Sequence, residues 1–285
     1  MTRIDAHMHV WDLTVRDQPW TTVGDLAPLH RSFALDDVAA ERARARIDGV
    51  VLVQTLAVAE ETSEMLTLAE ADPAVAGVVG WVDLTAGDVG ERLARLRTHS
   101  RGERLVGIRH LVQSEPDQRW LCRADVRRGL AAVAGADLAY DLLVVPHQLA
   151  AARETVAALP DLRFVVDHLA KPPIASGELE PWATDIRALA ALPNVTCKLS
   201  GMVTEADWSR WTVEALRPYA EVVLDAFGPD RVLFGSDWPV CTLAATYDDV
   251  VAAAEQLVAG LDAHEREAVF GGNARAMYRL PERAG

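Results

Sequence analysis

Short apolar runs alternate along this chain with longer segments in which apolar residues recur every three or four positions. Such alternation is expected when a parallel sheet is built from successive strand and helix units. The apolar runs predict eight strands, at residues Ile4–His9, Val50–Thr55, Val75–Val82, Leu105–His110, Leu138–Leu142, Leu162–Asp167, Val195–Leu199 and Val232–Gly235. The helical periods predict helices at Ser63–Ala71, Gly90–Arg97, Asp125–Ala134, Leu149–Leu159, Trp182–Leu192 and Thr212–Phe227.

Eight strand and helix units in 285 residues indicate an α/β fold that closes on itself, a (β/α)8 TIM barrel. The competing fold, an open doubly wound sheet, normally carries a Gly-rich phosphate turn after its first strand, and none is present. The first strand is followed instead by the long segment 11–47, which we interpret as a loop and a helix covering one mouth of the barrel. No linker or change in composition divides the chain, so we expect residues 1–285 to form one distorted barrel domain.

The charge balance narrows the range of partners. The chain has 42 acidic and 28 basic side chains, a net charge of −14, and such an excess repels phosphate backbones and anionic lipid surfaces. The sequence therefore predicts no nucleic-acid partner and no membrane partner. The first residues lack the pattern of a signal peptide, and Cys122, Cys197 and Cys241 have no C-x-x-C spacing, which favours a reducing, cytoplasmic location.

Titratable side chains occupy the carboxyl ends of several predicted strands, where barrel enzymes carry their active sites. His7 and His9 close the first strand, and because side chains two apart on a strand point the same way, both imidazoles can face the barrel axis. His168 follows the sixth strand and Asp237 the eighth. A histidine at a strand end can be structural and an aspartate can cap a helix, but this combination favours a functional site. The apolar surroundings of Asp237 suggest that partial burial tunes its carboxylate to act as a base.

These residues resemble the pattern of the metal-dependent amidohydrolase superfamily. Further stretches in the same order are similar to its sugar-acid lactonases, the group of L-fuconolactonases and L-rhamnonolactonases: residues Gly77–Asp83, Gly107–His110, Val166–Pro172, Cys197–Trp208 and Phe227–Cys241. The resemblance extends from Asp5 to about Tyr278, nearly the whole chain.

The resemblance implies that His7, His9, His168 and Asp237 surround a lactone carbonyl and its attacking water. These four side chains could hold one divalent cation, with Zn²⁺ favoured by the nitrogen-rich set. The fourth strand ends in Arg109 and His110 instead of the lysine or glutamate that bridges two metals, so a second ion is not expected. Relatives that work without metal leave open whether the ion is required. His147 is either a substitute ligand or, as its place beyond the fifth strand favours, a capping or surface residue.

Other polar and aromatic side chains at the strand ends suit a hydroxylated ring. The residues predicted to bind substrate are Gln54, Trp81, Asp83, His110, Lys198 and Trp238. Lys171 is as well explained by a solvated loop, and Asp141, in the middle of a strand, by pairing with a basic neighbour inside the barrel.

The predicted reaction is hydrolysis of a neutral sugar-acid lactone. Asp237 would act as general base, and His168 with Arg109 or the metal would polarise the carbonyl. The alternatives are a hydrolase or decarboxylase for an aromatic-derived carboxylated substrate on the same fold, and a sugar-acid binder without turnover. An anionic substrate should meet an arginine-rich mouth, which this sequence lacks. The expected partner is a small sugar lactone, bound by a monomer or a homodimer.

Overall fold

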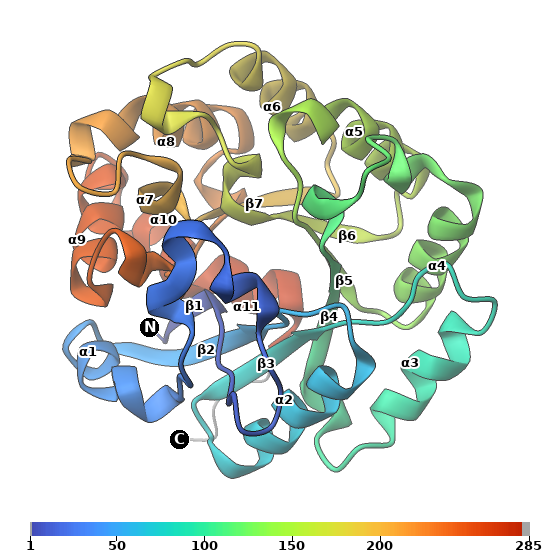
Figure 1. The fold of residues 1–285 in the computed structure, drawn as a ribbon. Coiled ribbons are helices and arrows are strands. Elements are labelled where there is room, and N and C mark those ends of the chain that lie inside the picture. Colours follow the sequence, from blue (N-terminus) through green and yellow to red (C-terminus); the bar gives the residue numbers. More distant parts are fainter. Residues whose placement is uncertain (1, 281–285) are drawn as a thin grey trace.

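The computed structural model describes residues 2–280, in which eight parallel strands pair in chain order around a barrel (Figure 1). The strands are β1 Arg3–Met8, β2 Ile47–Val53, β3 Val75–Gly80, β4 Leu105–His110, β5 Ala139–Leu142, β6 Arg163–Val166, β7 Val195–Leu199 and β8 Val232–Phe234. The predicted barrel is confirmed, and each predicted strand overlaps an observed one.

The seam between β8 and β1 is closed by residues just beyond the strands. Met8 and Trp238 form a parallel bridge, the His9 N–H donates to the Trp238 carbonyl at 2.7 Å, and the Asp237 N–H donates to the His7 carbonyl at 2.9 Å. The carboxylate of Asp5 adds a side-chain connection, because its Oδ1 accepts the N–H groups of His7 and Ser236 at 3.1 and 2.8 Å. The seam therefore joins the two chain segments that carry His7, His9 and Asp237.

Helices surround the barrel, as Figure 1 shows. The six predicted helices are observed with small shifts at their ends, as α2 Ala59–Ala71, α3 Val89–Arg97, α4 Ala124–Gly135, α5 Leu149–Ala158, α6 Trp182–Ala190 and α8 Val213–Phe227. The helix expected within residues 11–47 is α1 Ala39–Arg44. Helices that the sequence did not predict are α7 Met202–Glu205, α9 Tyr247–Leu257, α10 Ala263–Glu267 and α11 Asn273–Tyr278. Three of these follow β8, where no further strand marks their limits. Among the described residues no helix has the length and apolar character needed to cross a membrane.

The segment after β1 lies across the barrel mouth, where it appears dark blue at the front of Figure 1. It contains the short 3₁₀ turns η1 Pro19–Thr22, η2 Gly24–Leu29 and η3 Leu35–Val38 before α1 begins. Its aromatic rings pack edge to face: Trp11 contacts Phe33 at 5.1 Å between ring centroids, and Phe33 contacts Trp238 at 5.5 Å. These contacts hold the segment against the loop that carries Asp237 and confirm the interpretation of residues 11–47 as a cover.

The C-terminal helix α11 contributes to a core cluster shared with inner strand residues. This cluster contains Val51, Val53, Val79, Ala139, Val165 and Leu233 together with Ala274 and Tyr278. The Tyr278 hydroxyl donates to the carboxylate of Asp141, with distances of 2.8 and 2.9 Å to its two oxygens. The last helix is thus joined to a buried carboxylate inside the barrel. Asp141 also pairs with Lys198, so it has a neutral and a cationic partner.

Replacing Tyr278 by Phe should lower the free energy of unfolding by about 1–3 kcal/mol, because it removes a donor from a buried carboxylate without creating a cavity. Urea unfolding followed by circular dichroism measures the change. Tyr219→Phe is the matched control, because its hydroxyl donates to the uncharged carbonyl of Glu178. Equal costs for the two variants would contradict the role assigned to the Tyr278 hydroxyl.

Candidate active site

Four predicted site residues meet at the carboxyl ends of the strands. Asp237 Oδ1 lies 3.4 Å from His9 Nε2, 3.8 Å from His7 Nε2 and 3.8 Å from His168 Nε2. The Nε2 atoms of His7 and His9 are 3.2 Å apart. All four side chains are buried. Residues from β1, β6 and β8 therefore converge on one carboxylate oxygen.

The local backbone is unusual at two of these residues. His168 has φ of 51° and Asp237 has φ of 58°, in the left-handed region that side chains with a Cβ seldom adopt. Such conformations cluster at functional sites, where the surrounding structure holds them. Neighbouring glycines leave space for the rings: a Cβ on Gly201 would lie 2.6 Å from His168 Nδ1, and one on Gly235 would lie 2.7 Å from the Cβ of His7.

Hydrogen bonds on the far side of two imidazoles aim their Nε2 atoms at Asp237. His9 Nδ1 lies 2.7 Å from the Val53 carbonyl, which can only accept, so Nδ1 donates to it and Nε2 faces Asp237. His168 Nδ1 lies 2.9 Å from the hydroxyl of Ser200. Partners of this kind fix the ring orientation of metal-ligating histidines.

A network of charged side chains lies against His7 inside the barrel. Asp167 Oδ2 accepts from Arg109 Nη1 at 3.0 Å, and Asp167 Oδ1 lies 2.9 Å from Lys198 Nζ and 3.3 Å from His7 Nδ1. Lys198 also pairs with Asp141 at 2.6 Å. The predicted pairing of Asp141 with a basic neighbour is confirmed.

The environment shifts the pKa values of these groups in different directions. Burial lowers the pKa of His168 to about 4. Burial, followed by the charge of Lys198, lowers the pKa of His7 well below its usual range. For Asp237, burial alone would raise the pKa, but the nearby imidazoles, first His168 and then His9, bring it below its ordinary value. The expected burial of Asp237 is observed, and the neighbouring imidazoles outweigh the effect of the lost solvent on its pKa.

The donor set fits a divalent cation. His7, His168 and Asp237 each offer a ligand atom within 4.8 Å of the others, and His9 Nε2 is 3.4 Å from Asp237 Oδ1. Ligands about 2.0–2.2 Å from a tetrahedral zinc ion are roughly 3.3–3.5 Å from one another, close to the spacing seen here. The lone pair of His9 Nε2 and the carboxylate would repel each other unless a cation or a proton lies between them. These residues form a candidate metal site.

The predicted substrate-binding residues are distributed unevenly. Gln54 is buried beside Arg109: its Nε2 donates to the Arg109 carbonyl at 3.2 Å, and the guanidinium donates to the Gln54 backbone carbonyl. Trp238 is buried at the mouth against Phe33. Lys198 lies deeper in the barrel and is fully buried, with its ammonium engaged by Asp141 and Asp167.

The other predicted substrate-binding residues lie at the rim of the barrel mouth. The Trp81 indole N–H donates to His110 Nδ1 at 3.0 Å, so His110 Nε2 carries the proton that it donates to Glu115 at 2.7 Å. The ring nitrogens of His110 are thus occupied by protein partners. Asp83 accepts from Thr85 in a turn and lines a surface cleft between α2 and α3, apart from the convergent group. His147 is exposed in a 3₁₀ turn before α5, which agrees with the capping or surface interpretation.

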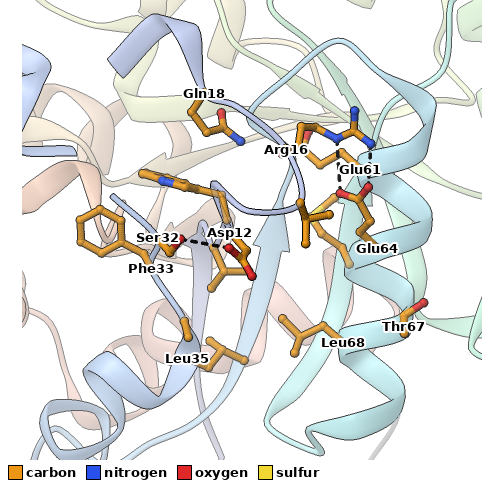
Figure 2. Close-up of a pocket in the computed structure, with 15 residues that line it drawn as sticks. Asp12, Arg16, Gln18, Ser32, Phe33, Leu35, Glu61, Glu64, Thr67 and Leu68 are labelled. Atoms are coloured by element: carbon orange, nitrogen blue, oxygen red, sulfur yellow. Dashed lines mark hydrogen bonds and ion pairs between the residues drawn. The ribbon is translucent and has the colours of Figure 1, made fainter. Parts of the chain in front are cut away.

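A separate cavity of about 440 Å³ lies beside the cover, between residues 10–18 and 32–35 and helix α2 (Figure 2). Its lining is mostly apolar and includes Leu35 and Leu68. Figure 2 shows the ion pair of Arg16 with Glu64, 2.7 Å long, at its edge. None of the four convergent residues lines it. The ion pair of Arg16 with Glu64 connects the cover to α2.

Sequence reasoning missed residues that support the site from behind. Asp167 was predicted only as the last residue of the sixth strand, although it contacts His7, Arg109 and Lys198. Asp5, two positions before His7, and Ser200 were not singled out. The polar residues Asp5, Asp141, Asp167 and Lys198 inside apolar strand runs were the available signal, because a buried charge needs a partner.

Comparison with known proteins shows to which family this chain is related. A family model described as amidohydrolase matches residues 4–280. The chain belongs to the amidohydrolase family. It is 40% identical to an L-fucono-1,5-lactonase of Burkholderia multivorans over 99% of this chain and 97% of that protein.

Two solved structures place this amidohydrolase among its relatives. The crystal structure of a Burkholderia multivorans amidohydrolase with bound zinc has a TM-score of 0.93 and 39% identity, covering 99% of this chain and 100% of that one. A probable 2-pyrone-4,6-dicarboxylic acid hydrolase from Acinetobacter baumannii, at 19% identity, has a TM-score of 0.78 over 98% of this chain and 100% of its own. The second likeness is one of fold alone.

The convergent donor set predicts that the purified chain binds one divalent ion, and that His168→Ala reduces the bound amount at least about tenfold, the usual minimum cost of a lost metal contact. Elemental analysis after dialysis against a limiting metal buffer measures both proteins. His147→Ala is the matched control, since His147 is exposed and away from the site. Two ions per wild-type chain, or equal binding by the two variants, would contradict this assignment.

Proposed function

We propose that this amidohydrolase hydrolyses a sugar-acid lactone of the L-fucono or L-rhamnono type to the open-chain acid. The observation that carries the proposal is the convergence of three imidazoles on the Asp237 carboxylate at the mouth of the barrel. The 40% identity to an L-fucono-1,5-lactonase along nearly the whole chain supports the same reaction.

Lactone hydrolysis requires a base for the attacking water and positive charge near the developing oxyanion. The contacts of Asp237 with the imidazoles involve Oδ1, which leaves its second oxygen to take the proton from water. Its lowered pKa keeps the carboxylate ionised at neutral pH. Asp237 then returns the proton to the ring oxygen as the acyl bond breaks.

His168 and Arg109 are assigned to the carbonyl oxygen, on the side away from the water that Asp237 activates. His168, held by Ser200, presents Nε2 toward the reacting group. Arg109 supplies fixed positive charge, since its Nη1 lies 3.3 Å from His7 Nε2. The charge of Arg109 would stabilise negative charge that develops on the carbonyl oxygen, and His168 would contribute through the cation that it helps to hold.

We propose Zn²⁺ as the cation of this site, held by His7, His9, His168 and Asp237. The nitrogen-rich donor set suits zinc, and a relative with 39% identity carries it. When bound, the ion would supply positive charge for the oxyanion and acidify the attacking water.

Pairing of the basic side chains favours a neutral substrate. Arg109 is paired with Asp167, Lys198 with Asp141 and Asp167, and Lys171 with Glu205 at 2.9 Å. Each of these cations is therefore balanced within the chain. A substrate bearing two carboxylates would bring uncompensated charge close to Asp237, which is costly in a buried site.

Replacing Asp237 by Asn preserves the shape of the side chain and removes the base. We expect turnover of L-fuconolactone to fall at least about 100-fold while the protein stays folded. A pH-indicator assay and circular dichroism measure the two properties. Asp137→Asn is the control, because Asp137 precedes β5 at the opposite end of the barrel. Near-normal turnover by Asp237→Asn would assign that residue a structural role.

The substrate class can be tested on a single preparation. We expect the specificity constant for L-fuconolactone or L-rhamnonolactone to exceed that for a dicarboxylated lactone or pyrone by roughly a hundredfold or more, because specificity then depends on hydroxyl contacts. Steady-state kinetics with both classes give the ratio. Preference for the dicarboxylate would favour the alternative function.

A further inference from the structure

The ammonium of Lys198 lies among three polar side chains inside the barrel. Its Nζ lies 2.6 Å from Asp141 Oδ2, 2.9 Å from Asp167 Oδ1 and 3.0 Å from His7 Nδ1, and the side chain is fully buried. A lysine ammonium has three N–H donors and no acceptor. The ammonium has hydrogen-bond geometry toward Asp141 of β5 and His7 of β1. Its contact with Asp167, the first residue after β6, is an ion pair.

The same three partners are ligands of the kind that divalent cations take. His7, Asp141 and Asp167 each offer a ligand atom within 4.8 Å of the others, and all three are buried. Two carboxylates and an imidazole around a buried point are common around a bound metal. In this chain the ammonium of Lys198 occupies the space between these three side chains.

The lysine is also required for the charge balance of the barrel interior. Arg109 pairs with Asp167 through Oδ2, while Asp141 has Lys198 as its cationic partner and Tyr278 as a neutral donor. Removing Lys198 would leave Asp141 without a cationic contact in a dry environment, which is strongly destabilising unless another cation enters.

We propose that Lys198 is a built-in cation that occupies a latent second metal position, formed by His7, Asp141 and Asp167, and so limits this barrel to one exchangeable ion. Lys198 is then a positioning residue: it holds the Nδ1 side of His7 while Nε2 faces the mouth. A second divalent ion is excluded because its charge would lie next to the ammonium. The inference rests on the proposed function only in assigning His7 to the catalytic mouth.

The test compares metal stoichiometry in the wild-type chain and in Lys198→Ala. After equilibrium dialysis against Zn²⁺, elemental analysis should find one more ion per chain in the variant than in the wild type, whatever the wild-type value. Thermal unfolding adds a second measurement. Zn²⁺ should raise the midpoint of Lys198→Ala by several degrees more than that of the wild type, because an ion that binds the native state stabilises it.

A double variant identifies the ligands. Adding Asp141→Asn to Lys198→Ala removes one carboxylate and the uncompensated charge, so this protein should fold without Zn²⁺ and bind no additional ion. Equal stoichiometry in the wild type and Lys198→Ala would overturn the proposal. So would a Lys198→Ala protein that stays insoluble with Zn²⁺ while the double variant is soluble, because a divalent ion would then be unable to replace the lysine.

The metal-binding test of Lys198 can fail or succeed independently of the proposed lactonase activity. Lactonase activity is assayed on the wild-type chain, whereas the inference concerns an added ion in a variant. In Lys198→Ala, a further His168→Ala change should remove the ion at the mouth and leave the added one, since His168 does not belong to the inner group. Loss of both ions would place them in one shared site and contradict a second position.

Discussion

The ion pairs of Asp167 are the interaction on which the rest of this site depends. One buried carboxylate contacts Arg109 from β4, Lys198 from β7 and His7 from β1. Burial raises the pKa of Asp167, but the charge of Lys198 and the contact with His7 bring it well below the usual range. Without Asp167, two cations would face each other across a dry barrel interior. The strands therefore position the His7 imidazole through charge as well as through packing.

The seam between the first and last strands couples closure of the barrel to assembly of the site. The N–H groups that bind Asp5 belong to His7 and Ser236, next to the chain segments that carry His9 and Asp237. The Tyr247 hydroxyl from α9 donates to the second oxygen of Asp5 at 3.1 Å. A helix outside the barrel thus supports the carboxylate that joins the segments carrying His9 and Asp237.

The sequence predicted the strands, the barrel and the four convergent residues because each depends on local pattern. A buried parallel strand is an apolar run, and a polar residue at its carboxyl end is visible without knowing its partners. The role of Lys198 depends on long-range contacts, because its partners lie in β5, in β1 and just after β6. Asp83 instead makes a local turn contact with Thr85, which its position after a strand does not reveal. The lowered pKa of Asp237 also depends on long-range contacts, since the imidazoles that lower it follow other strands or lie in them.

The paired charges also bear on how such a site can distinguish substrates. Arg109 and Lys198 are committed to carboxylates of the chain, and His110 to Trp81 and Glu115. A substrate carboxylate could gain a cationic partner only by breaking one of these pairs, which would leave a buried protein charge uncompensated. A hydroxyl can be accommodated by neutral donors and acceptors without that loss. Discrimination in this barrel is therefore expected to depend on the positions of hydroxyl groups and on the aromatic surfaces at the mouth, where Phe33 packs against Trp238.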